Sequence, residues 1–181
     1  MSSMFDDLEY VMIDEERLMK RVVELAKQLE NDFREKDPLM ICVLKGSTMF
    51  FADLARNMDI PLRFDFMAVS SYGAGTTSGR LKMKKDLDSS VEGRHVIIVE
   101  DIMDSGNTLF YLKGLLSERK AASVSICTLL DKPSRREADI KPDYTGFEIE
   151  NEFVVGYGLD YNERYRNMKI VGVLKRSIYG G

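Results

Sequence analysis

Residues 96–108 read Val-Ile-Ile-Val-Glu-Asp-Ile-Met-Asp-Ser-Gly-Asn-Thr, and they are the most informative stretch of the chain. The four apolar residues 96–99 predict a buried strand, and Glu100 and Asp101 follow it directly. Ligands of open α/β sheets bind beyond the carboxyl ends of the strands, so this acidic pair is expected at a ligand site. Adjacent carboxylates repel one another, and Mg²⁺ or ribose hydroxyls would offset that repulsion.

Residues 104–108 predict a turn into a helix. Small residues let backbone N–H groups face an anion, and a helix N-terminus favours negative charge. The hydroxyls of Ser105 and Thr108 add donors, so the turn is expected to bind phosphate. It is not a Walker A loop, which requires G-x-x-x-x-G-K-[ST]. An ordinary helix cap would explain Ser105-Gly106 taken alone, but the preceding acidic pair favours a ligand site.

Apolar patterns on both sides of this stretch predict an α/β domain. A helix is expected over residues 15–33 with Asp14 as its N-cap, and others after Gly46-Ser47 and after Thr108. Strands are expected at 39–44, 62–69, 124–130, 153–155 and 170–174. Because nearly continuous apolar strands alternate with helices, the sheet is expected to be mostly parallel and covered on both faces. One domain over residues 1–181 is expected.

Residues 70–94 differ from the rest in composition. They contain four glycines among Ser, Thr and Lys, and the first half predicts a long mobile loop. Leu81 and Met83 alternate with lysines, which indicates a ribbon in the second half. An ordinary exposed hairpin remains the alternative.

Composition excludes several classes of protein. His95 is the only histidine, and Cys42 and Cys127 lie in apolar runs, so a zinc site or a Ser-His-Asp triad is not expected. The formal charge of −4 argues against nucleic acid as a partner. No apolar run is long enough for a membrane span, and residues 1–10 lack the basic residues of a signal peptide, so a cytoplasmic location is expected.

Residues 99–109 resemble the phosphoribosyl pyrophosphate (PRPP) motif of type I phosphoribosyltransferases. Other segments resemble the hypoxanthine-guanine branch of that family: 44–47 its pyrophosphate loop, 70–73 the start of its lid, and 131–133 and 153–161 its purine-binding segments. Residues 164–174 continue the match. Five ordered motifs thus cover nearly the whole chain. Ser105 stands where the family often has Thr, which keeps the hydroxyl.

The resemblance implies how PRPP would be bound. Lys45 and Gly46 would contact pyrophosphate, with the Leu44–Lys45 peptide in the cis form, and Arg166 would lie near the same group. Ser71 and Tyr72 would belong to the lid. The 5′-phosphate would be bound by Ser105, Gly106, Asn107 and Thr108. Glu100 and Asp101 would hold the ribose hydroxyls and one Mg²⁺, and Asp160 would help to hold a second.

The resemblance also implies the chemistry at the base. A small hood beside the sheet would hold a 6-oxopurine, with Lys132 donating to O6, Phe153 stacking on the ring and Val154 contacting its edge. Asp104 would take the N7 proton. The implied reaction is purine salvage, which gives IMP or GMP from hypoxanthine or guanine. A homo-oligomer, either dimer or tetramer, is expected.

Three other functions fit parts of the same pattern. A regulator on this fold would sense PRPP and bind nucleic acid, but it would need a basic face, whereas 30 acidic residues outnumber 26 basic ones. A phosphoribosyltransferase for adenine or a pyrimidine is disfavoured by Lys132 and Phe153. An inactive scaffold would have to retain five motifs without use. Without the resemblance, Lys132, Arg136 and Arg166 would be expected as solvated charges, and Phe153 and Val154 as core residues.

Overall fold

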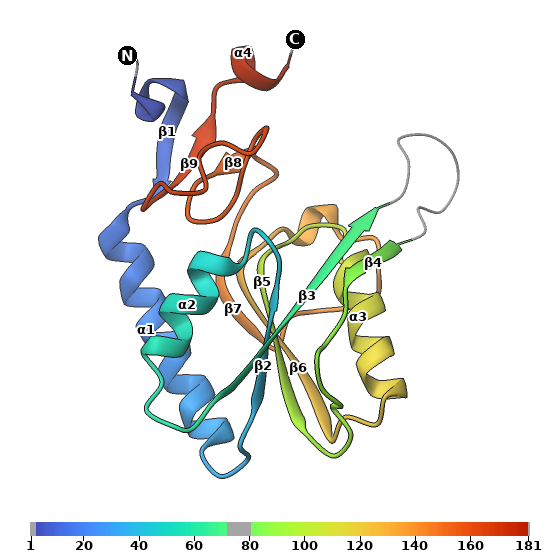
Figure 1. The fold of residues 1–181 in the computed structure, drawn as a ribbon. Helices are drawn as coiled ribbons and strands as arrows, with labels where there is room; N and C mark the ends of the chain where they lie inside the picture. Colours follow the sequence, from blue (N-terminus) through green and yellow to red (C-terminus); the bar gives the residue numbers. More distant parts are fainter. Residues whose placement is uncertain (1–2, 72–80, 181) are drawn as a thin grey trace.

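The computed structural model describes residues 3–71 and 81–180 and has a six-stranded central sheet (Figure 1). The strand order is β4-β3-β2-β5-β6-β7, and every pair is parallel except β3 with β4. The strands are β2 (Leu39–Val43), β3 (Arg63–Ser71), β4 (Leu81–Lys85), β5 (His95–Met103), β6 (Ser123–Asp131) and β7 (Tyr144–Glu148). The predicted mostly parallel α/β sheet is confirmed.

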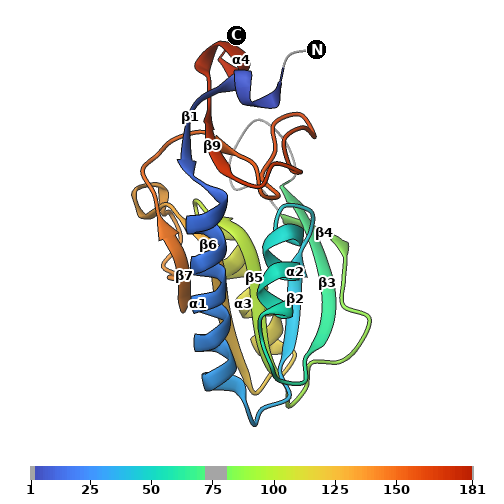
Figure 2. The ribbon, with the colours of Figure 1, turned by 90° about the vertical axis from the view of Figure 1, so that its left-hand side faces the viewer.

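Helices cover both faces of this sheet. Helices α1 (Glu15–Phe33) and α2 (Thr48–Arg56) lie on one face, in front of the strands in Figure 2, and α3 (Asn107–Glu118) lies on the other. Side chains alternate along each strand, so β2 sends Met40 and Cys42 to the first face and Ile41 to the second. Both faces are therefore apolar, which is why the strands read as continuous apolar runs.

Helix α1 forms as the sequence predicts. The Asp14 carboxylate accepts a hydrogen bond from the backbone N–H of Arg17 at 2.8 Å, so it caps the N-terminus of the helix. The apolar residues at helical spacing are all buried against the sheet: Leu18, Val22, Leu25, Leu29 and Phe33. None of the helices in residues 3–71 and 81–180 combines the length and apolar character that crossing a membrane requires.

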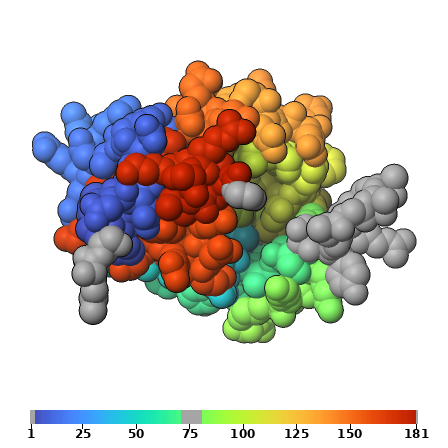
Figure 3. Space-filling view, turned by 90° about the horizontal axis from the view of Figure 1, so that it is seen from above, coloured from blue at the N-terminus to red at the C-terminus, as the bar shows by residue number. Residues whose placement is uncertain are grey.

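A second, smaller sheet forms the part that we call the hood: β1 (Leu8–Ile13), β9 (Val171–Leu174) and β8 (Val154–Val155), with the loops that join β8 to β9. Both of its strand pairs are antiparallel. The prediction that the apolar runs 153–155 and 170–174 form strands of the parallel sheet is therefore wrong, because both belong to the hood. The pairing of β1 with β9 places the described N-terminal and C-terminal segments next to each other at the top of the molecule, blue beside red in Figure 3.

Several short elements were not predicted. Their apolar residues do not recur at a clear helical or strand spacing. These elements are β1, β7, the 3-10 helices Met4–Asp7 and Pro133–Arg135, and α4 (Arg176–Tyr179). The ribbon predicted around Leu81 and Met83 is confirmed as β4, which pairs antiparallel with β3. The predicted mobile loop between these strands falls mainly on residues outside the described part of the chain.

Candidate active site

The turn after β5 lines a pocket of about 170 Å³. Its walls are contributed by one continuous segment and the start of α3: residues 100–106, Thr108 and Leu109. Gly106 precedes α3 with φ +82°, a conformation that a side chain would strain. The turn can therefore direct the first N–H groups of α3 towards the pocket.

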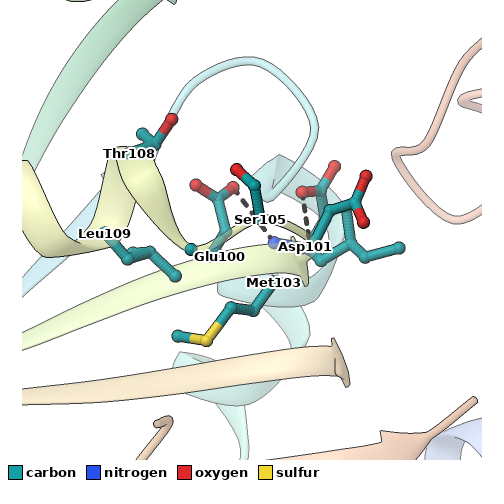
Figure 4. A pocket seen from close by; sticks show the side chains of 9 residues that line it. Glu100, Asp101, Met103, Ser105, Thr108 and Leu109 are labelled. Carbon is teal, nitrogen blue, oxygen red and sulfur yellow. Dashed lines mark hydrogen bonds between the residues drawn. The ribbon is translucent and has the colours of Figure 1, made fainter. Parts of the chain in front are cut away.

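Two carboxylates lie at the mouth of this pocket. In Figure 4, Glu100 and Asp101 point to the same side as the Ser105 hydroxyl, and Met103 points the opposite way. Glu100 is only 8% exposed, and it accepts from the backbone N–H of Asp101 at 3.2 Å. Burial, reinforced by the Asp101 charge, raises the pKa of Glu100 well above its ordinary value, and burial raises the pKa of Asp101 as well. A cation would relieve this repulsion, so the pair fits a divalent metal.

Two glycines bring distant loops against the acidic pair. A Cβ on Gly46 would lie 1.7 Å from Oδ2 of Asp101, so any other residue there would displace that carboxylate from its present position. A Cβ on Gly158 would lie 1.9 Å from the carbonyl oxygen of Gly46. The Leu44–Lys45 peptide beside them is cis, as the resemblance implied. The 44–47 loop therefore lies between the acidic pair and the hood.

Charged side chains from the hood approach the same loop. Lys45 forms an ion pair with Glu163 at 3.1 Å, and Arg166 forms ion pairs with Asp160 at 2.8 Å and with Glu163 at 3.4 Å. Arg166 also donates to the carbonyl oxygen of Gly158 at 2.7 Å. Lys45, Asp160 and Arg166 thus meet in one place, and Glu163, which was not predicted as a site residue, joins the two cations.

The acidic residues do not form one metal centre. Among residues 3–71 and 81–180, no group of three or more His, Cys, Asp or Glu side chains is close enough to hold an ion. Glu100 and Asp101 form a pair at the end of β5, while Asp160 is bound to Arg166 in the hood. The acidic pair and Asp160 are therefore separate places for a cation and do not share one centre.

The residues predicted to contact the base lie at the end of β6 and in the hood. Lys132 is 8% exposed, and its Nζ donates to the carbonyl oxygen of Glu152 at 2.7 Å. Burial lowers the pKa of Lys132, and the nearby negative charge of Asp104 acts in the opposite direction. Phe153 is partly exposed and stacks on Tyr179 at 4.5 Å between ring centroids. Val154 is buried in β8.

Asp104 begins the predicted phosphate turn, and its charge acts on the nearby Lys132. Its side chain is about half exposed, and Oδ1 accepts from Nε of Arg135 at 3.3 Å. The backbone N–H of Lys132 donates to the carbonyl oxygen of Met103 at 3.0 Å, which joins the two segments. Ser71 ends β3 at the neighbouring part of the sheet, and Tyr72 lies outside the described residues.

Arg136 is the residue whose position the sequence did not indicate. Residue type alone would place it on the surface, yet its side chain is only 14% exposed and is bound to Asp131. Long charged side chains are buried mainly where they are paired. Only its closeness in sequence to Lys132 could have drawn attention to it.

Comparison with known proteins shows the family to which the chain belongs. The phosphoribosyl transferase domain family matches residues 10–162. The hypoxanthine-guanine phosphoribosyltransferase of Bacillus subtilis is 56% identical over 174 residues, which cover 96% of this chain and 97% of that protein. The bifunctional protein TilS/HprT of Listeria monocytogenes is 52% identical over 178 residues, and this chain spans only 28% of its length.

Solved structures give the same result. The crystal structure of a hypoxanthine phosphoribosyltransferase from Staphylococcus aureus superimposes with a TM-score of 0.96 at 48% identity, covering 99% of this chain and 98% of that one. Similarity at this level extends through the sheet and the hood alike. The chain therefore belongs to the phosphoribosyltransferase family, and within that family to the hypoxanthine-guanine phosphoribosyltransferases.

Proposed function

We propose that this chain, as one domain over residues 1–181, transfers the 5-phosphoribosyl group from PRPP to hypoxanthine or guanine. The products are IMP or GMP and pyrophosphate, and the reaction serves purine salvage. The observation that carries the proposal is the acidic pair of buried Glu100 and half-buried Asp101, which lines a pocket of about 170 Å³ in a chain of this family.

PRPP would be bound by the turn and by the acidic pair. Its 5′-phosphate would enter the pocket and accept hydrogen bonds from the backbone N–H groups and hydroxyls of the turn: Ser105, Gly106, Asn107 and Thr108. Glu100 and Asp101 would accept from the ribose hydroxyls and hold one Mg²⁺. When bound, Mg²⁺ would neutralise charge on the pyrophosphate as it leaves. Asp160 would help to hold a second ion.

Pyrophosphate would lie between the 44–47 loop and the hood. The backbone of Lys45 and Gly46 would donate to its oxygens, and Arg166 would supply positive charge. In the structure, Lys45 and Arg166 both pair with the carboxylate of Glu163, so one anion bridges the two cations. Pyrophosphate would take the place of that carboxylate.

The base would lie between β6 and the hood. Lys132 has three ammonium donors and uses one on Glu152, which leaves two for the purine O6. Tyr179 covers one face of Phe153, so the purine would stack on the other. Val154 would contact the edge of the base through its backbone.

The chemical step would exchange one bond for another at ribose C1. The C1–O bond to pyrophosphate breaks, the bond from purine N9 to C1 forms, and the proton on N7 passes to Asp104. The carboxylate of Asp104 makes N9 a better nucleophile as that proton leaves. Ser71 and Tyr72 would close over the site and exclude water, which otherwise competes for the activated sugar.

The experiment that tests this proposal is a product assay with PRPP and each of hypoxanthine, guanine, xanthine and adenine. We expect nucleotide from hypoxanthine or guanine when Mg²⁺ is present, none in excess EDTA, and recovery when Mg²⁺ is added back. An absence of turnover with every purine would contradict the proposal. PRPP binding without turnover would favour the regulator.

We also propose that the chain acts in the cytoplasm as a homo-oligomer, a dimer or a tetramer. Large apolar side chains such as Phe64 and Phe110 are more than half exposed, which would be unfavourable if they stayed in water. Light scattering measures the mass directly. A monomer at micromolar concentration would contradict this part of the proposal.

A further inference from the structure

The guanidinium of Arg136 binds to the two strand ends from which the site is built. Its Nη2 pairs with the carboxylate of Asp131 and donates to the carbonyl oxygen of Met103 at 3.4 Å. Its Nε donates to the carbonyl oxygen of Asp104 at 3.1 Å, and its Nη1 donates to that of Ile140 at 2.8 Å. Met103 is the last residue of β5, and Asp131 is the last residue of β6. One side chain thus links both strand ends to the start of the phosphate turn.

The rest of the segment packs behind the same turn. The carbonyl oxygen of Ser105 accepts from the backbone N–H groups of Glu137 at 2.9 Å and of Ala138 at 3.1 Å. A Cβ on Gly106 would lie 2.8 Å from Cδ of Arg136, so the stem of the arginine lies directly against the turn. The turn is therefore held by residues 136–138, none of which lines the pocket.

We propose that Arg136 is a positioning residue for the 5′-phosphate and for Asp104, an inference that rests on the proposed function. It does not line the pocket of the turn. Arg136 fixes the carbonyl groups of Met103 and Asp104. It thereby sets the direction of the N–H groups of the turn, and it also orients the Asp104 side chain. Pyrophosphate binds elsewhere, between the 44–47 loop and the hood, and does not depend on Arg136.

A lysine cannot replace this arginine. The guanidinium is a planar fork whose five N–H groups reach several acceptors in fixed directions, whereas an ammonium is a compact point charge. Arg136→Lys therefore retains the charge beside Asp131 but loses most of the carbonyl contacts. A misplacement of about 1 Å can lower a rate by ~10²-fold. We expect Arg136→Lys to lower kcat/KM for PRPP by about that factor.

Removing a buried ion pair also destabilises a protein, so stability and positioning must be separated. The matched control is Arg119→Lys, because Arg119 makes two hydrogen bonds of 2.7 Å to the carboxylate of Asp86 and none to the site. Thermal unfolding identifies conditions in which each variant is fully folded. Under those conditions the control is expected to retain wild-type kinetics.

The deciding measurement is ligand binding by calorimetry, which needs no turnover. In Arg136→Lys, GMP, which carries a 5′-phosphate, is expected to bind at least tenfold more weakly, whereas pyrophosphate with Mg²⁺ binds as it does to the wild type. Arg136→Ala should recover part of its activity in guanidinium at concentrations well below those that unfold it, and Arg119→Ala should show no gain.

Equal losses for both ligands, or wild-type GMP binding in folded Arg136→Lys, would overturn the proposal. Failure of the wild type to form nucleotide would instead reject the proposed function and leave this binding comparison valid.

Discussion

Asp104→Asn is expected to lower kcat by roughly 10²–10⁴, the usual contribution of a positioned acid-base group. The amide has nearly the same shape as the carboxylate but cannot accept the N7 proton. The side chain is half exposed and held by one ion pair, with Arg135, so the fold loses little. Binding of PRPP should change little, because the turn is proposed to bind phosphate largely through its backbone. Steady-state kinetics with hypoxanthine and direct titration of PRPP measure the two effects separately.

Asp139→Asn is the matched control for this change. Asp139 is exposed, lies in the same segment as Arg135, and loses the same charge. Its kcat should stay within about twofold of the wild type, since exposed substitutions away from a site have small effects. A wild-type kcat in Asp104→Asn would remove Asp104 from the role of base.

The central sheet was predictable because each of its main strands is a local signal. In residues 96–99 and 124–130, side chains that point to either face of the sheet are mostly apolar. This pattern is expected only for strands whose sheet is covered on both faces. Strand β7 was missed because Gly146 and Thr145 interrupt its apolar residues. It pairs at the edge of the sheet, where less of its surface is buried.

The hood shows where local patterns stop being informative. Val154–Val155 and Val171–Leu174 are as apolar as the central strands, so their sequence does not tell which sheet they join. That choice is made by β1, whose residues pair with β9 although they lie about 160 positions earlier. Pairing over such distances in the sequence leaves no periodic signal.

The candidate site divides in the same way. Glu100, Asp101 and the phosphate turn are adjacent in the sequence, so their chemistry could be predicted from it. The contact of Asp101 with Gly46, and the ion pairs that Glu163 makes with Lys45 and Arg166, depend on chain segments brought together by folding. The buried position of Arg136 is of this second kind, and only the three-dimensional structure reveals it.

The choice of base is expected to depend on Lys132. A 6-oxopurine presents an acceptor, O6, where adenine presents an amino group. An ammonium donates and cannot accept, so hypoxanthine and guanine gain a charge-assisted hydrogen bond worth about 1.5–3 kcal/mol. Adenine would leave two donors facing each other near a side chain that is 8% exposed. Polar mismatch of this kind discriminates by as much as ~10⁴, so the wild type should nearly ignore adenine.

Lys132→Met retains much of the apolar stem and removes the donors. We expect kcat/KM for hypoxanthine and guanine to fall by about 10–200-fold, the kinetic equivalent of the lost hydrogen bond. The ratio of kcat/KM between these oxopurines and adenine should therefore become smaller. The carbonyl oxygen of Glu152 also loses its donor, so some loss of stability should accompany the change.

A general loss of stability would lower the rates with all three bases together, whereas removal of the O6 contact lowers only those with the oxopurines. The ratio of kcat/KM between hypoxanthine and adenine therefore separates the two causes, and Lys141→Met, at an exposed lysine in the same segment, should leave that ratio unchanged. If Lys132→Met discriminates among the three bases as the wild type does, the specificity for oxopurines lies in another residue.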